Sequence, residues 1–220
     1  MKKKIIKIAI DSPAAAGAGT LANKLSKHYN LAYLDTGKIF RYIAYIKLKN
    51  PKKFNKNTIK KKINTLKPSD LRINKLLTNQ IGIEASIIAK KKYIRKIVHS
   101  YQTRFAYKPP KKYNGSCLDG RDITYNIVPD ADFKFFITAN IKIRAKRRYK
   151  ELKLINNEIT YSEVLKSIKK RDKSDLTRKI SPLKKTKDSI LINTSNLSKR
   201  ACFLKIKKII DKKIKINGNI

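Results

Sequence analysis

Lys4-Ile-Ile-Lys-Ile-Ala-Ile-Asp11, followed by Ser12-Pro-Ala-Ala-Ala-Gly-Ala-Gly-Thr20, is the stretch that decides the expected fold. Its first part is apolar and β-branched, as in a strand buried within a parallel sheet. Beyond it, apolar residues at helical spacing from Leu21 to Tyr29 predict a helix that starts near Gly19 or Thr20. The loop between strand and helix consists of small residues. Its backbone N–H groups, together with the positive end of the helix dipole, would surround a phosphate group.

This loop departs from the phosphate-binding pattern G-x-x-x-x-G-K-[ST] and keeps only the second glycine, Gly17. Ser12 stands at the first glycine position and Ala18 at the lysine position. Gly19 occupies the hydroxyl position, and Thr20 follows it, placed to offer its hydroxyl to a phosphate or to nucleotide-bound Mg²⁺. The alternative is a tight strand-to-helix connection that binds no ligand, and the loop alone does not decide between the two.

The composition is strongly basic. Lys and Arg total 55 against 15 Asp and Glu, which gives a formal net charge of +40 in 220 residues. Such a charge attracts polyanions. The lysines are nevertheless spread over the whole chain, and Ile and Asn are abundant as well, so solvated helix faces are favoured over a dedicated nucleic-acid site. The length fits one α/β domain with a small appendage.

Cysteine and histidine are scarce and widely spaced. Cys117 and Cys202 have no metal-ligand spacing around them, and His28 and His99 are the only histidines. Zinc sites and Ser-His-Asp chemistry are therefore not expected. Both cysteines lie beside apolar residues, which favours core packing in a reducing compartment. No cleavage site follows the first apolar run, and no run is long enough to span a membrane, so we expect a cytoplasmic protein without a membrane partner.

The rest of the chain alternates between strand and helix patterns. Further strands are expected at 31–34, 117–119, 132–138 and 190–193, and helices at 39–48, 78–106, 141–155, 161–170 and 198–214. Residues 50–73 are polar and Lys-rich and are expected to be mobile with at most one short helix, and residues 171–178 form a polar connector. Five strands separated by helices predict an α/β fold with a parallel sheet, whose ligands bind beyond the carboxyl ends of the strands.

Four polar clusters follow one another along the chain. They are Asp11–Thr20, Asp35-Thr-Gly-Lys-Ile-Phe-Arg41, Asp119-Gly-Arg-Asp122 with Pro129-Asp-Ala131, and Arg171-Asp-x-x-Asp175-x-x-Arg178 with Ser181-Pro-Leu183. In this order, and with Arg144, Arg147 and Arg148 between the third and the fourth, they resemble the bacterial cytidylate kinases. These P-loop kinases of the nucleoside monophosphate kinase family phosphorylate CMP and dCMP. The resemblance extends from Ile5 to about Leu197.

The resemblance implies a role for each matching residue. It implies an ATP site made of Ser12, Pro13, Ala14, Ala15, Ala16, Gly17, Ala18, Gly19 and Thr20, with ATP-bound Mg²⁺ near Thr20 and, through water, Asp119. The implied CMP site comprises Thr36 together with Arg41, Arg121 and Arg178 at the phosphate, Arg171 and Asp175 at the ribose, and Ser86, Arg95 and Asp122 at the cytosine. Arg144, Arg147 and Arg148 are implied to close over the donor phosphates as catalytic residues with Arg121.

Each of these residues also has an ordinary structural explanation. The arginines at 41, 144, 147 and 148 could lie in solvent on basic helices, and Arg95 follows a run of lysines. Asp119 and Asp122 could pair with nearby lysines or cap a turn, and Ser86 lies among apolar residues in a predicted helix. Phosphoryl transfer does require many charged donors around the phosphates, and arginine suits this best.

Several positions depart from the family pattern. Typical members have Lys at the position of Ala18, Gly at those of Ser12, Ala15 and Thr124, and Tyr at that of Phe40. Lys24 and the three arginines at 144, 147 and 148 are candidates to replace the missing lysine charge. Family members also carry a three-stranded insertion in the acceptor-binding region, and Asn50–Ile73 is too short and too polar to form it.

Three functions are therefore considered. The leading one is phosphoryl transfer from ATP to CMP or dCMP by a monomer made of one kinase domain, with no specific nucleic-acid partner. Its core would comprise residues 1–49, 107–140 and 180–220, its acceptor-binding region 50–106 and its lid 141–179. The second is a nucleotide-binding protein that has lost catalysis through Ala18. The third is a basic nucleic-acid-binding module, which would need aromatic residues interleaved with the basic ones.

Overall fold

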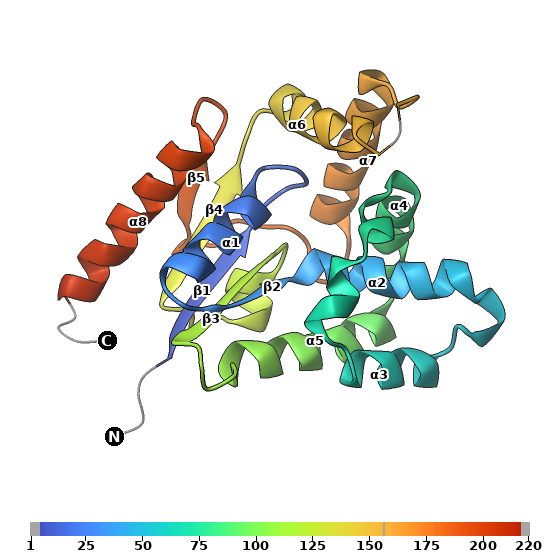
Figure 1. Ribbon diagram of the computed structural model, residues 1–220, viewed down its shortest axis with the longest axis horizontal. Coiled ribbons are helices and arrows are strands. Elements are labelled where there is room, and N and C mark those ends of the chain that lie inside the picture. Colours follow the sequence, from blue (N-terminus) through green and yellow to red (C-terminus); the bar gives the residue numbers. More distant parts are fainter. Residues whose placement is uncertain (1–4, 156, 217–220) are drawn as a thin grey trace. The chain divides into compact units, whose positions relative to one another are not determined.

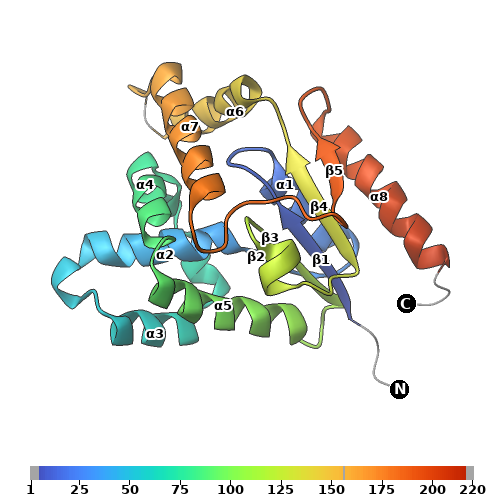
Figure 2. The ribbon, with the colours of Figure 1, turned by 180° about the vertical axis from the view of Figure 1, so that it is seen from behind.

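Five parallel strands form a single sheet in the computed structural model, which describes residues 5–155 and 157–216. The order across the sheet is β2-β3-β1-β4-β5, and both views show β1 between β3 and β4 (Figures 1 and 2). The strands are β1 (Ile6–Asp11), β2 (Ala32–Asp35), β3 (Gly115–Gly120), β4 (Phe133–Thr138) and β5 (Ile190–Asn193). The predicted α/β class and five-stranded parallel sheet are confirmed. Lys4, which the prediction included in the first strand, lies outside the described residues.

The chain divides into two compact units. The first contains the sheet and consists of residues 1–35, 103–140 and 183–220. Residues 36–102 and 141–182 form the second unit. One of the boundaries, between residues 102 and 103, falls within the helix Lys92–Tyr107. The predicted core, by comparison, extended to residue 49 and so included a helix that lies in the second unit.

In the first unit, two helices pack on the sheet: α1 (Ala18–His28) and α8 (Lys199–Ile216). Their apolar faces join one buried cluster with the central strands, in which α1 contributes Leu21 and Leu25 and α8 contributes Ile206 and Ile210. All six residues of β3 are buried, as expected for an interior strand of a parallel sheet. The predicted helices at 21–29 and 198–214 are thus confirmed, each to within a few residues.

The second unit is helical. Its α-helices are α2 (Thr36–Lys49), α3 (Lys56–Asn64), α4 (Asn79–Ile88), most of α5 (Lys92–Tyr107), α6 (Ile141–Lys153) and α7 (Tyr161–Thr177). Three short 3₁₀ helices connect them: η1 (Pro51–Lys53), η2 (Pro68–Arg72) and η3 (Asn74–Leu77). No strand lies between residues 36 and 114, all of which the structure describes. The expectation that residues 50–73 do not form a three-stranded insertion is therefore confirmed.

The single helix predicted over residues 78–106 is wrong. It is divided into α4 and α5 at Ala89–Lys91. The break has a physical cause, because the buried side chain of Arg95 donates through Nε to the Ala89 carbonyl at 2.6 Å. An amide one turn further along the chain would bind that carbonyl in a continuous helix. The backbone instead tightens, with Lys90 and Lys91 donating to carbonyls three residues earlier.

The polar connector predicted over residues 171–178 is also wrong, because α7 continues through it to Thr177. Thr160 and Glu163 form a capping box at the start of the helix. At its end, Asp175 pairs with Arg171 and Arg178, which lie four residues before it and three residues after it. Opposite charges at these spacings support a helix although every residue involved is polar.

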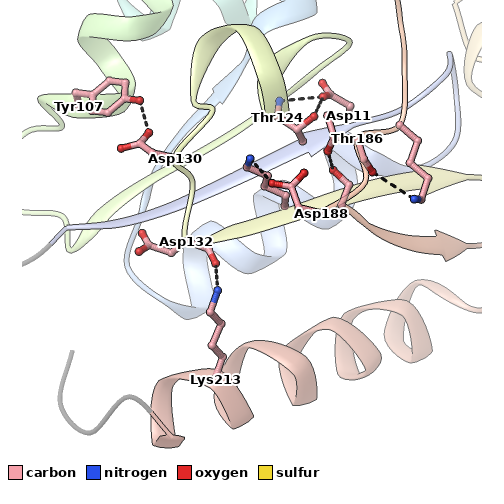
Figure 3. Close-up of polar contacts among 11 residues, drawn as sticks. Asp11, Tyr107, Thr124, Asp130, Asp132, Thr186, Asp188 and Lys213 are labelled. Carbon is pink, nitrogen blue, oxygen red and sulfur yellow. Dashed lines mark hydrogen bonds and ion pairs between the residues drawn. The ribbon is translucent and has the colours of Figure 1, made fainter.

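A buried carboxylate joins the first strand to the third. Asp11, the last residue of β1, is fully buried and accepts hydrogen bonds from the amides of Ile123 (2.8 Å) and Thr124 (2.9 Å) and from the Thr124 hydroxyl (2.6 Å), as Figure 3 shows for Thr124. Both donors lie in η4 (Ile123–Ile127), one turn of π-helix shortly after β3. Burial raises the pKa of Asp11 to about 6, although the three hydrogen bonds oppose the shift.

This raised pKa makes stability depend on pH. The folded state binds the Asp11 proton more tightly than the unfolded state, whose carboxyl has the ordinary value of 3.8. The contribution of Asp11 to the free energy of unfolding is therefore greatest below about pH 4 and decreases by about 3 kcal/mol as the pH rises through about 6. We expect the difference in unfolding free energy between the parent chain and Asp11→Asn, measured with urea, to decrease by this amount between about pH 4 and about pH 7.

Asp188→Asn is the control. A hydrogen bond from Lys134 lowers the pKa of Asp188, so its contribution to stability is lost only at more acidic pH. The parent-to-variant difference for Asp188→Asn should change little over the same range. An Asp11→Asn difference that is equally insensitive to pH would contradict the raised pKa of the buried carboxylate.

Candidate functional site

The loop between β1 and α1 is held at both ends by hydrogen bonds to other strands. The Ser12 amide donates to the carbonyl of Gly120, the last residue of β3 (3.1 Å). Near the other end of the loop, the Ala16 carbonyl accepts a hydrogen bond from the buried hydroxyl of Thr194, the residue that follows β5 (2.9 Å). Within the loop, Ala15 has φ 59° and Gly17 has φ 91°, both in the left-handed region. Gly17 adopts this conformation without cost, whereas Ala15 does so against its intrinsic preference.

The first turn of α1 presents backbone donors at the end of this loop. Gly17 is the N-cap of α1, and no side chain of the described residues caps the helix there. The first amides of a helix have no carbonyl partner within it, and the helix dipole adds partial positive charge at the same place. Thr20 lies in this first turn with an exposed side chain. These are the features expected of a phosphate-binding loop.

Ala18, at the position of the usual lysine, points into the protein rather than toward solvent. Its side chain is only 4% exposed and belongs to the apolar cluster of the first unit, together with Ala16 and Leu21. The residue that removes the expected charge therefore contributes to core packing.

Asp119, the predicted support for Mg²⁺, lies next to the loop. A side-chain carbon on Gly19 would be 3.6 Å from Oδ2 of Asp119 and 3.4 Å from the hydroxyl of Tyr33. Tyr33, in β2, donates a hydrogen bond to Oδ1 of Asp119 (2.8 Å) and contacts the Gly19 carbonyl at 3.3 Å. Burial and the neighbouring carboxylate of Asp119 raise the pKa of Tyr33, so this hydroxyl stays protonated and remains a donor.

Arg121 and Asp122 follow β3 directly. Nη1 of Arg121 donates to the Gly120 carbonyl at 3.2 Å. Asp122 is 5% exposed, precedes η4 and accepts a hydrogen bond from the Asn126 amide group at 2.8 Å. With the loop, they lie beyond the carboxyl ends of β1 and β3, which are paired along their whole length, and Asp119 is the penultimate residue of β3. The first unit thus gathers its predicted site residues at one edge of the sheet.

In the second unit, two of the predicted arginines bind neighbouring carbonyls. Nη1 of Arg41, from α2, donates to the carbonyls of Leu76 (2.7 Å) and Thr78 (3.2 Å). Nη2 of Arg148, from α6, donates to the carbonyl of Leu77 at 2.7 Å. An implied acceptor-phosphate residue and an implied lid residue are therefore fixed on the same three-residue segment.

Two of the residues implied to read the base, Ser86 and Arg95, donate to backbone carbonyls. The Ser86 hydroxyl donates to the Gly82 carbonyl one turn earlier in α4 (3.3 Å), as a structural serine in a helix would. Arg95 binds the Ala89 carbonyl, and its guanidinium lies 5.4 Å from the ring centre of Phe40 in a cation–π contact. Thr36 is buried at the first position of α2.

Carboxylates of α7 hold three further arginines. Asp175 is 4% exposed, contacts Nη1 of Arg178 at 3.0 Å and lies 3.8 Å from Nε of Arg171. One turn earlier in α7, Asp172 contacts Nη1 of Arg144 at 2.7 Å. Arg144 and Arg148 were predicted to act together, yet the structure gives them different partners, since Arg148 binds Leu77 and Glu151. Arg147 lies between them on α6.

Several residues that fix the site were not predicted. Tyr33 orients Asp119, Thr194 holds the loop, Asp172 pairs with Arg144, and Asp11 anchors η4. Asp11 and Asp172 lie within the polar clusters of the sequence, and Tyr33 lies on the same face of β2 as Asp35, two residues before the second cluster. The sequence gives no such signal for Thr194, and it does not indicate the partner of any of the four.

Among the described residues, no three His, Cys, Asp or Glu side chains come together as a possible metal site. Within the same residues, every helix is too short or too polar to cross a membrane.

Comparison with known proteins gives consistent matches over nearly the whole chain. Residues 8–212 match the model of the family described as cytidylate kinase. The chain is 43% identical over 213 residues to the cytidylate kinase of Bartonella tribocorum, covering 96% of both chains. It is 37% identical over 228 residues to that of Mesomycoplasma hyopneumoniae, covering 97% of both. Among solved structures, an uncharacterized protein from Eubacterium ventriosum has a similar fold, with a TM-score of 0.54 at 17% identity over 94% of this chain and 99% of the other.

Proposed function

The chain belongs to the cytidylate kinase family, and from this premise we propose that it transfers the terminal phosphoryl group of ATP to CMP or dCMP. Such a nucleoside monophosphate kinase produces ADP and CDP or dCDP and serves pyrimidine nucleotide metabolism. The observation that carries the proposal is the family match over residues 8–212. The described geometry supports it, because a phosphate-binding loop and several ordered arginines are what phosphoryl transfer requires.

We propose that the loop from Ser12 to Thr20 holds the phosphates of ATP through its backbone amides. ATP-bound Mg²⁺ fits the donors nearby, which are the exposed Thr20 hydroxyl and the Asp119 carboxylate held by Tyr33. A single hydroxyl and a single carboxylate suit Mg²⁺, which usually keeps several waters and binds to substrate phosphates. When bound, the ion would neutralise charge on the phosphates. The role of Tyr33 is to keep the Asp119 carboxylate facing the loop.

We propose that the acceptor CMP is held by the arginines and carboxylates that the family resemblance implies. Arg41, Arg121 and Arg178 would bind its phosphate, Arg171 and Asp175 its sugar, and Ser86, Arg95 and Asp122 its base. Arg144, Arg147 and Arg148 would act on the donor phosphates during transfer, and Arg121 would also act as a catalytic residue. In support, Asp175, Asp172 and the carbonyls of residues 76–78 hold several of these arginines in defined positions before substrate is present.

The two other functions considered gain no support. No observation favours loss of catalysis or a dedicated nucleic-acid site, so only the kinase is proposed. We further propose that the enzyme acts in the cytoplasm, where its two buried free cysteines would stay reduced. A net charge of +40 would repel other copies of the chain, which supports a monomer.

The proposal is tested by the choice of acceptor. ADP formation from ATP is measured in a coupled assay with CMP, dCMP, UMP and AMP. CMP or dCMP should be the preferred acceptor, because a site that hydrogen-bonds cytosine leaves buried polar groups unpaired with another base, at about 1–3 kcal/mol per group. A faster reaction with AMP than with CMP would contradict the proposed function.

Asp175 provides a test of the acceptor site. Alanine would remove the carboxylate from a buried arginine, a change that costs about 3–5 kcal/mol of stability, so Asp175→Asn is the better variant. It keeps an oxygen acceptor for Arg178 but removes the charge. We expect the KM for CMP to rise about tenfold or more and the KM for ATP to change by less than about twofold, because the lost interaction serves one substrate.

Asp172→Asn is the matched control, since it changes a carboxylate on the same helix that holds Arg144 instead. It should raise the KM for ATP more than the KM for CMP. If Asp175→Asn changed the KM for CMP and the KM for ATP equally, Asp175 would not belong to the proposed acceptor site.

Ala18 provides a test of the donor site. If Lys24 or one of the arginines at 144, 147 and 148 supplies the missing charge, Ala18→Lys should change kcat by less than about tenfold, under about 1.4 kcal/mol of barrier. We expect this outcome, because the acceptor residues are all present. We also expect the urea midpoint of Ala18→Lys to decrease, since the substituted position is buried in an apolar cluster.

Single-turnover rates with saturating ATP and CMP distinguish the two cases. An inactive parent chain that Ala18→Lys activates by about 100-fold or more would show that no other cation replaces the lysine.

A further inference from the structure

Gly82 occupies a position in α4 where glycine is unfavourable for the helix itself. It is the fourth residue of the helix Asn79–Ile88, and its amide donates to the Thr78 carbonyl as in a regular helix. Its φ is outside the left-handed range, so the backbone conformation does not require glycine. Glycine is among the least favourable residues inside a helix. A glycine at this position therefore suggests that a side chain here would collide with a neighbouring group.

The obstructed group is the guanidinium of Arg41. A side-chain carbon built on Gly82 would lie 2.9 Å from Nη2, 3.3 Å from Nη1 and 3.4 Å from Cζ of Arg41. All three of the nearest atoms belong to this one planar group, so the guanidinium lies directly against the backbone of α4. The first distance is shorter than any ordinary contact of a methyl group, and the end of the arginine side chain would have to move to accommodate one.

The same guanidinium is also fixed from a second direction. Nη1 donates to the carbonyls of Leu76 and Thr78, which immediately precede α4. Thr78 is itself the N-cap of α4, with its hydroxyl accepting from the Ile81 amide at 3.4 Å. Two carbonyls and the bare surface at Gly82 thus define one position for a side chain that would otherwise have many rotamers.

We propose that Gly82 is a positioning residue for CMP binding, because the absence of a side chain there allows Arg41 to lie where it binds the acceptor phosphate. This inference rests on the proposed function, in which Arg41 contacts that phosphate. The Gly82 position acts only through Arg41. A methyl group would displace the guanidinium while leaving its charge in the protein.

The test is Gly82→Ala, with Michaelis constants for CMP and ATP and the urea midpoint measured on the full chain. We expect the KM for CMP to rise about tenfold, as when a charge-assisted hydrogen bond to substrate is weakened, and the KM for ATP to change by less than about twofold. The urea midpoint should stay the same or increase, because alanine favours the helix and only a flexible side-chain end has to move. A purely structural role for Gly82 would instead lower the midpoint and affect both substrates.

Two further variants distinguish displacement of the Arg41 guanidinium from a general destabilisation of α4. Glu84→Ala removes the ion pair between Glu84 and Lys47, which joins α4 to α2 at 2.6 Å without involving Arg41, and it should leave the KM for CMP within about twofold of the parent value. In an Arg41→Ala background, Gly82→Ala should add less than about twofold to the KM for CMP, because the residue it displaces is absent.

The outcomes also separate this inference from the proposed function. A parent chain that does not phosphorylate CMP would overturn both. A parent chain active on CMP, with kinetics that Gly82→Ala leaves unchanged or alters equally with and without Arg41, would overturn the role of Gly82 alone.

Discussion

The buried carboxylate of Asp11 is the interaction on which the arrangement of the first unit depends. Asp11 ends β1, and its three hydrogen bonds fix the turn of η4 that follows β3. That turn begins after Asp122, so Asp119, Arg121 and Asp122 are kept close to the loop that starts at Ser12. The Thr124 hydroxyl supplies one of these bonds. It adds a donor for a buried anion, which burial alone would disfavour.

The parts of the fold that could be predicted are those encoded by local patterns. Short apolar runs between helical patterns indicated the five strands and the parallel sheet, because such runs can be recognised from the local sequence. The break between α4 and α5 could not be found this way. It depends on the Arg95 side chain reaching back to Ala89, and a run of lysines surrounding the break gives no sign of it. The polar end of α7 was misread for a related reason, since its support comes from ion pairs rather than from an apolar face.

The sequence indicates which residues are candidates for the site, but it does not indicate their partners. The four polar clusters show which side chains are available, because motif residues lie close together in the sequence. Tyr33 with Asp119, Asp172 with Arg144, and Gly82 with Arg41 are contacts between separate elements, and each decides the orientation of a functional group. Gly82 illustrates the difficulty, since its significance lies in a missing side chain within an ordinary helical pattern. The role of such a glycine can be recognised only when the position of the neighbouring arginine side chain is known.

Backbone carbonyls hold several of these arginines. The chain has 15 acidic residues for 55 basic ones, so its carboxylates are scarce. Arg41, Arg95, Arg121 and Arg148 each donate to main-chain oxygens. A carbonyl fixes the direction of a guanidinium but, unlike a carboxylate, does not neutralise its charge. An arginine whose direction is fixed in this way needs little reorganisation when phosphates arrive. The carboxylates that are present, Asp172 and Asp175, hold arginines buried deeply enough to need a counter-charge. In this chain, therefore, the scarcity of acidic residues is compatible with precise placement of positive charge, because the backbone supplies the acceptors.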